Sequence, residues 1–199
     1  MEATSQISNT VKNVTGEYYL TGVMETASVI SLKPDSTFLF YFSYGAAERE
    51  GSGTWTLRDS TLILNSKPRP GKDFRLIQSS RSASQQITIT CQHPNPDFFS
   101  FLQCFLQTPE HQNVYKPTRD GILTIPSTPI DSIGFLFVIC GDRTTWFKDL
   151  PKEHNNFIFI PEEWICNIYC SNLQLKFKDL GLIGEHPLLA GKQFIYQKN

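Results

Sequence analysis

The fold of this chain is decided by residues 32–45, LKPDSTFLFYFSYG, where two extended runs flank a tight turn. Pro34 fixes φ for the first central position of such a turn, and the side chains of Asp35 and Ser36 can hydrogen-bond the backbone beside it. Aromatic and β-branched residues resume at Thr37, and both faces of this second run are apolar enough to be covered. The stretch therefore predicts two neighbouring strands of a β-meander.

Strand signals continue on both sides of this turn. Before residue 80 the pattern predicts six strands, at residues 16–23, 26–33, 37–44, 52–57, 61–65 and 73–79. Pro68 and Pro70 interrupt regular structure ahead of the sixth, because neither proline can donate a hydrogen bond to a sheet. The small polar stretch 79–84, SSRSAS, is typical of a linker between domains.

Beyond this stretch, short strands separated by turns predict a β-sandwich over residues 84–170. Near the C-terminus, residues 173–178 and 191–197 again alternate like strands. These two and the six earlier strands make eight, the number at which a small antiparallel sheet closes into a barrel. We therefore expect an all-β protein with a discontinuous eight-stranded antiparallel barrel, residues 14–80 plus 172–199, an inserted sandwich and a flexible tail at residues 1–13. The alternative is two sequential sheets, without a return of the C-terminal strands.

Composition excludes several classes of partner. The chain has 199 residues with a formal net charge of −1, 40% hydrophobic and 13% aromatic residues, as a folded β protein would. It has no basic patch of the kind that binds nucleic acid, and no 18-residue apolar run, so neither nucleic-acid binding nor membrane insertion is expected. All five cysteines lie after residue 90 in apolar surroundings, which favours buried, reduced thiols for most of them.

Several short motifs resemble those of a known family. The residues at 16–19, 24–28, 33–38, 44–47 and 51–55 (GEYY, METAS, KPDSTF, YGAA and GSGTW) resemble the lipocalin-like barrels of uncharacterised bacterial proteins, which are often exported. The run TRDG at residues 118–121, placed before a strand, is similar to transthyretin-like or carboxypeptidase-regulatory-like sandwiches. These resemblances imply a lipocalin-like barrel, a transthyretin-like sandwich and a binding or structural role rather than catalysis. They also favour a periplasmic or secreted location if a leader has been removed.

The predicted barrel offers a candidate ligand site. The aromatic residues of the barrel would line a cavity for an apolar ligand. Alternatively, they would form the hydrophobic core, because small barrels are often filled by their own side chains. Glu25 would face the interior paired with Arg49 or Arg69, or else be a solvated turn residue. The candidate ligand-binding residues are Tyr18, Glu25, Phe40, Phe42, Tyr44, Trp55 and Arg69.

No catalytic or metal motif stands out. Cys166 and Cys170 have no second Cys/His pair nearby, and the four histidines are far apart, so no metal or cofactor is expected. Cys140, three residues before Arg143, is the least improbable nucleophile. We therefore expect a non-enzymatic binding protein that holds a small apolar molecule in the barrel or contacts a protein partner. The alternatives are a structural or protein-interaction module with a filled barrel core, and an uncharacterised hydrolase.

Overall fold

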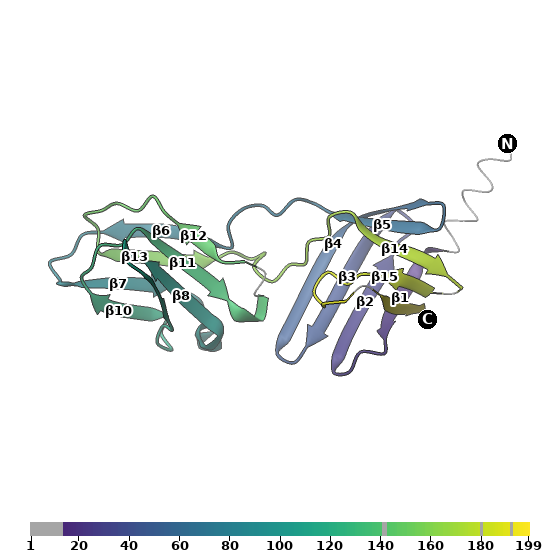
Figure 1. The fold of residues 1–199 in the computed structure, drawn as a ribbon, viewed down its shortest axis with the longest axis horizontal. Helices are drawn as coiled ribbons and strands as arrows, with labels where there is room; N and C mark the ends of the chain where they lie inside the picture. Colours follow the sequence, from purple (N-terminus) through teal and green to yellow (C-terminus); the bar gives the residue numbers. More distant parts are fainter. Residues whose placement is uncertain (1–13, 141–142, 180, 192) are drawn as a thin grey trace. The chain divides into compact units, whose positions relative to one another are not determined.

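The computed structural model describes residues 14–140, 143–179, 181–191 and 193–199. These form two compact units (Figure 1). The first unit comprises residues 14–69 and 166–199, and the second is Pro70–Ile165. The second unit is thus inserted into the sequence of the first.

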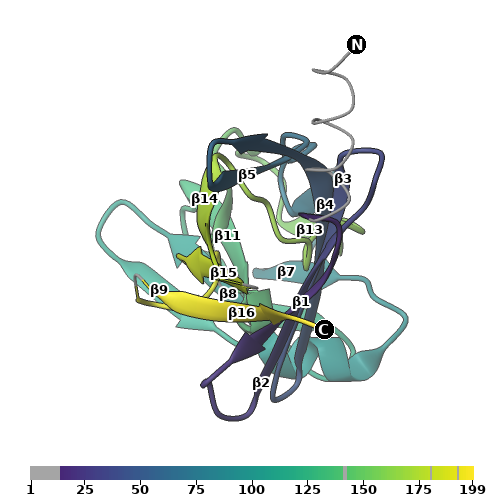
Figure 2. The same cartoon turned by 90° about the vertical axis from the view of Figure 1, so that its right-hand side faces the viewer.

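The first unit is a closed antiparallel barrel. In order around the barrel, the strands are β1, β16, β15, β14, β5, β4, β3 and β2, and Figure 2 looks onto this unit. The predicted return of the C-terminal strands is confirmed, because Tyr18 of β1 pairs with Lys198 of β16. The alternative of two sequential sheets is wrong. Strand bounds are β1 Gly16–Thr21, β2 Thr26–Leu32, β3 Thr37–Tyr44, β4 Ala47–Arg58, β5 Thr61–Ser66, β14 Leu173–Lys178, β15 Gly181–Gly184 and β16 Phe194–Lys198.

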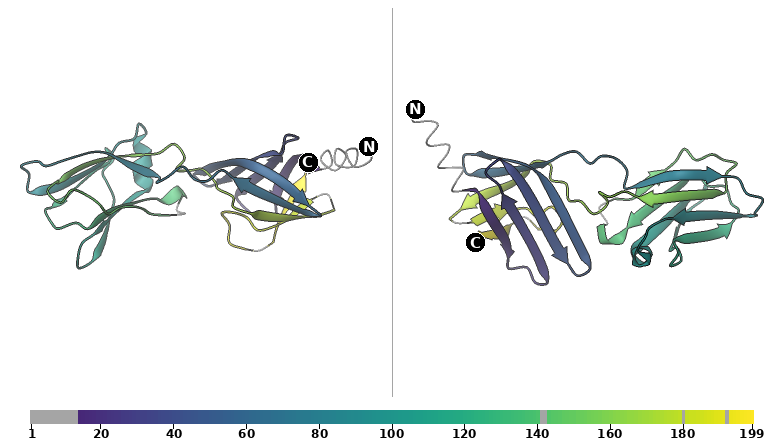
Figure 3. Two further views of the ribbon diagram at one scale, coloured as in Figure 1. Left: turned by 90° about the horizontal axis from the view of Figure 1, so that it is seen from above. Right: turned by 180° about the vertical axis from the view of Figure 1, so that it is seen from behind.

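The turn at residues 33–37 forms as its sequence predicts. The Asp35 carboxylate accepts hydrogen bonds from the Thr37 amide and hydroxyl, at 3.0 and 2.6 Å, and these bonds lower the pKa of Asp35. Ser36 has φ of 64°, and its carbonyl accepts a 2.8 Å bond from the amide of Trp55 on β4. The turn therefore fixes the register of β2, β3 and β4, which lie side by side in the right-hand view of Figure 3.

One strand and both boundaries of the inserted unit differ from the sequence prediction. The sixth predicted strand, β6 (Phe74–Ser80), belongs to the second unit, and β15 takes its place in the barrel. The run of consecutive barrel strands ends with β5, because Pro68 and Pro70 follow it and cannot donate hydrogen bonds to a sheet. The next strand beside β5 in the barrel is β14. The first domain boundary thus lies between Arg69 and Pro70 rather than at residues 79–84, which connect two strands within the sandwich. The second lies between Ile165 and Cys166 rather than at residues 170–172, because Ile168 and Cys170 pack into the barrel core.

The second unit is a sandwich of two four-stranded sheets, with strand orders β10-β7-β13-β6 and β12-β11-β8-β9. Its core joins the two sheets through aromatic contacts. The ring of Phe135 on β11 lies 5.0 Å from that of Phe74 on β6 and 4.8 Å from that of Phe159 on β13. The remaining strands are β7 Gln86–Cys91, β8 Leu102–Gln107, β9 Gln112–Tyr115, β10 Ile122–Pro126, β11 Ser132–Phe137, β12 Thr145–Phe147 and β13 Asn156–Pro161, with 3₁₀ helices η1 Pro96–Phe101 and η2 Val138–Cys140.

Candidate functional site

Most of the residues predicted to line a barrel cavity are core residues. The side chains of Tyr18, Phe40, Phe42 and Trp55 are between 0% and 5% exposed and belong to one hydrophobic cluster. The Tyr18 hydroxyl donates to the Val14 carbonyl at 2.6 Å, and the Trp55 indole donates to the Lys33 carbonyl at 3.1 Å. These four side chains therefore belong to the barrel core.

The other three predicted site residues do not face the barrel interior. Glu25 is exposed in the turn between β1 and β2, with φ of 56°, so the expectation of an inward carboxylate is wrong. Tyr44 is 53% exposed and is the last residue of β3. Arg69 lies after β5 with its guanidinium 4.5 Å from the ring of Tyr169. The structure does not bring these three residues together with the four core aromatics.

A buried polar group that the sequence did not reveal lies inside the barrel. His186 is 5% exposed, and its ring is within 6.3 Å, centroid to centroid, of the rings of Phe40, Phe42, Phe194 and Tyr196. Burial lowers the pKa of His186 to about 4. This histidine is therefore neutral at pH 7.

The hydrogen bonds of His186 define its tautomer. Its Nδ1 accepts the amide hydrogens of Leu188 and Leu189, at 3.0 and 3.1 Å. The proton of the neutral ring must then sit on Nε2, which lies 3.2 Å from the Ser28 hydroxyl oxygen. A protonated Nε2 donates to Ser28 and cannot take its proton, so this pair is not arranged as a nucleophile and its base.

Tyr196 completes this polar group. Burial raises its pKa well above the ordinary range, and the nearby Ser28 hydroxyl opposes that shift. No described residue makes a hydrogen bond of acceptable geometry with the Tyr196 hydroxyl, so proximity to Ser28 does not amount to a bond. The hydroxyl is therefore a buried polar atom without a hydrogen-bond partner among the described residues.

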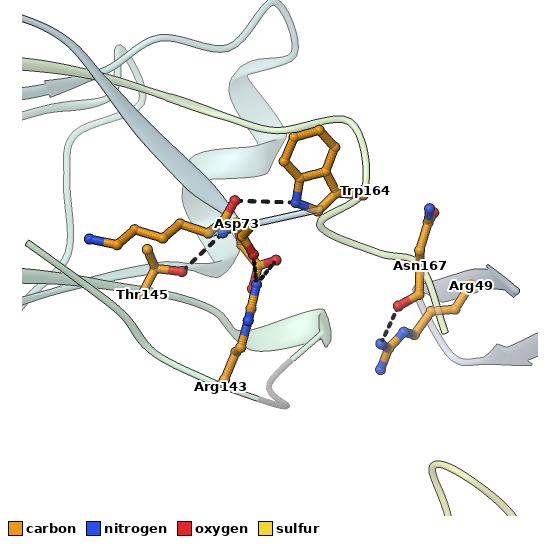
Figure 4. Close-up of polar contacts among 8 residues, drawn as sticks. Arg49, Asp73, Arg143, Thr145, Trp164 and Asn167 are labelled. Atoms are coloured by element: carbon orange, nitrogen blue, oxygen red, sulfur yellow. Dashed lines mark hydrogen bonds and ion pairs between the residues drawn. The ribbon is translucent and has the colours of Figure 1, made fainter. Parts of the chain in front are cut away.

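The return segment 166–170 is fixed against β4. Arg49 is buried, and its guanidinium donates to the Cys166 carbonyl at 3.2 Å and to the Asn167 carbonyl at 3.3 Å. Figure 4 shows the bond to Asn167. The amide of Ile168 donates to the Glu50 carbonyl at 2.6 Å. Ile168 and Cys170 join the barrel core, and burial raises the pKa of Cys170 to about 11. The Cys170 thiol is therefore protonated at neutral pH, which suits neither a nucleophile nor a metal ligand.

A surface groove of about 990 Å³ lies outside the barrel. It runs over the outer face of β14 and β15, because alternation along these strands points Leu175 and Leu182 inward and Lys176 and Ile183 outward. The lining residues are Thr61, Tyr169, Cys170, Ser171, Asn172, Leu173, Gln174, Lys176, Phe177, Lys178, Ile183, Gly184, Glu185, Pro187 and Gln193. Tyr169 connects the groove to the predicted site residue Arg69.

In the second unit, polar contacts hold the two sheets at one end (Figure 4). Arg143 donates two hydrogen bonds to the Asp73 carboxylate, Nε to Oδ2 at 2.7 Å and Nη2 to Oδ1 at 2.9 Å. The Asp73 amide donates to the Thr145 hydroxyl, and the Trp164 indole donates to the Lys72 carbonyl. Cys140 is buried, so the structure does not present it as the accessible thiol that was considered. Residues 141 and 142, between it and Arg143, lie outside the described residues.

Over the described ranges, no cluster of three or more His, Cys, Asp or Glu side chains is placed to bind a metal ion. Among the described residues, no helix combines the length and the hydropathy that a membrane-spanning segment requires. The fold thus defines an all-β protein with a closed eight-stranded barrel and a second unit of two sheets. Comparison with protein-family models, with curated proteins and with solved structures finds no match.

Proposed function

We propose that this protein is a non-enzymatic binding module whose barrel is a filled scaffold and whose ligand or partner binds outside it. The observation that carries the proposal is the burial of Tyr18, Phe40, Phe42 and Trp55 in one packed cluster. An apolar ligand inside the barrel would have to displace these side chains or the ring of His186. Their displacement would be unfavourable, because it would break the van der Waals contacts of a closely packed interior.

The chemistry of the site supports binding rather than catalysis. The Ser28–His186 pair has the wrong tautomer for proton abstraction, and the thiols of Cys140 and Cys170 are buried. Glu25 stands in a solvated turn, away from the barrel interior. The lipocalin-like and transthyretin-like likenesses, with their bacterial and exported associations, belong to the same proposal, and the antiparallel closure at eight strands supports the first of them.

Native mass spectrometry of the full chain, purified without refolding, tests the proposal. We expect the mass of the 22.7 kDa chain alone and no saturable binding of a fluorescent fatty-acid analogue. Phe40→Ala with benzene as the probe is the positive control, because loss of a buried ring leaves an apolar cavity that a molecule of that size can enter. A stoichiometric apolar molecule bound to the wild-type chain would overturn the proposal in favour of a ligand-filled barrel.

A further inference from the structure

The groove over β14 and β15 carries hydrogen-bonding side chains that have no partner among the described residues. The side chains of Gln174, Lys176, Lys178 and Gln193 make no hydrogen bond or ion pair with the described residues. The first three are exposed on β14. A concave surface with several unused donors meets the general requirements of a binding site.

The charge of the groove favours an anion. Two lysines and one carboxylate, that of Glu185, line it. Lys176 and Lys178 are two residues apart on one strand, so their side chains leave the same face, with Cα atoms about 7 Å apart. Because the whole chain carries a net charge of −1, this local excess of positive charge is not a general property of the surface.

The groove also offers apolar surface beside its donors. Ile183 and Pro187 contribute apolar atoms to its lining, and Tyr169 stands at its margin with the guanidinium of Arg69 4.5 Å from its ring. Lining of this mixed kind suits a ligand that has apolar C–H faces as well as hydroxyl and carboxylate oxygens. A bare inorganic anion would use only the lysines.

The closed barrel argues against an extended peptide in this groove. β14 is hydrogen-bonded to β5 on one side and to β15 on the other, so it has no free edge. A peptide would therefore gain no main-chain ladder, which is the usual source of affinity for extended peptides on sheets. The ligand must satisfy the amide and ammonium donors with acceptors of its own.

We infer that the groove over β14 and β15 binds a short acidic oligosaccharide through Lys176, Lys178 and the amides of Gln174 and Gln193. The lysines pair with the sugar carboxylates, and the amides bond the hydroxyl groups. The inference rests on the proposed function and adds the class of ligand and the residues that bind it.

Isothermal titration calorimetry of the full chain with trigalacturonate tests this inference. We expect saturable one-site binding that weakens as NaCl is raised, and no heat from neutral maltotriose. The double variant Lys176→Gln/Lys178→Gln should weaken binding by about tenfold or more, because each lysine supplies a charge-assisted hydrogen bond. The control is Lys33→Gln/Lys152→Gln, which makes the same change of charge at exposed positions outside the groove and should leave binding unchanged.

Three results would overturn the inference: no binding of trigalacturonate, equal loss in both double variants, or tighter binding of tri-glutamate at the same lysines. The last would assign the groove to acidic peptides instead. Circular dichroism of each variant separates loss of binding from loss of fold. Failure here leaves the native mass spectrum of the wild-type chain unchanged, whereas failure of the proposed function shows an apolar molecule bound to it, so the two failures are distinguishable.

Discussion

Protonation of His186 should weaken the barrel as the pH falls. The neutral ring accepts two backbone amides at Nδ1 and stands among four aromatic rings. A second proton would occupy Nδ1, break both bonds and place a charge in the core. Because the folded pKa is about 4 and the ordinary value is 6.5, the unfolded chain binds this proton more tightly than the folded chain. Folding stability therefore falls as the pH drops from 6.5 towards 4.

The size of the loss follows from the two pKa values. At pH 7 the contribution is close to zero, because both states are neutral. Linkage then gives a loss of about 2 kcal/mol at pH 5 and about 3 kcal/mol at pH 4, where it approaches its limit. Such a loss is a large share of the free energy of unfolding of a typical domain.

Urea unfolding at pH 7, 6, 5 and 4 measures this effect, with the chain compared to His186→Asn. Asparagine does not titrate, and its carbonyl oxygen can still accept an amide of the 188–189 turn. Carboxylates that titrate in the same range affect both proteins, so the difference between the two stabilities isolates the histidine. His111→Asn, at an exposed position, is the matched control and should follow the wild type. Parallel pH curves for wild type and His186→Asn would refute the reasoning.

Three further substitutions test the packing. Leu62→Ala removes a fully buried barrel side chain and should lower the free energy of unfolding in urea by about 3 kcal/mol. Gly53→Ala would place a Cβ 2.1 Å from the Asn65 carbonyl oxygen, so we expect a loss of about 3 kcal/mol or more in the same assay. Asp73→Asn weakens the bidentate pair with the 40%-exposed Arg143 and should cost about 1 to 2 kcal/mol, seen as faster proteolysis within Pro70–Ile165.

Seven of the eight barrel strands could be predicted because they carry local signals. Alternation over residues 173–178 and 191–197 identifies strands that match those of the N-terminal half in period. The predicted count of eight, which favours closure, was reached with residues 73–79 in place of β15. The sheet to which Phe74–Ser80 belongs could not be predicted in this way. A strand with one buried face reads alike in a barrel and in a sandwich, and only long-range partners such as Phe135 decide between them.

The site was less predictable than the fold. His186 lies in a segment without strand period, where a polar residue is expected to be solvated, and its burial depends on Leu188 and Leu189 packing against the core. Aromatic residues at inward positions could equally have lined a cavity, because alternation fixes the face of a side chain and not the space in front of it. The groove joins residues from Thr61 to Gln193, so no local motif marks it.

The insertion of a whole unit between two barrel strands raises the conformational entropy that the chain loses when the barrel closes. β5 ends at Ser66 and its partner β14 begins at Leu173, so barrel closure must bring together positions separated by roughly 100 residues, at a cost that grows with the logarithm of loop length. Within the second unit, however, the amide of Glu162 donates to the Asp73 carbonyl at 2.9 Å, and Arg75 pairs with the Glu162 carboxylate at 2.8 Å. Once these contacts form, the effective loop shrinks to roughly 20 residues, which lowers the closure cost by about 1.5 kcal/mol. The polar contacts at the ends of the inserted unit therefore favour closure of the barrel by shortening the loop that must be closed.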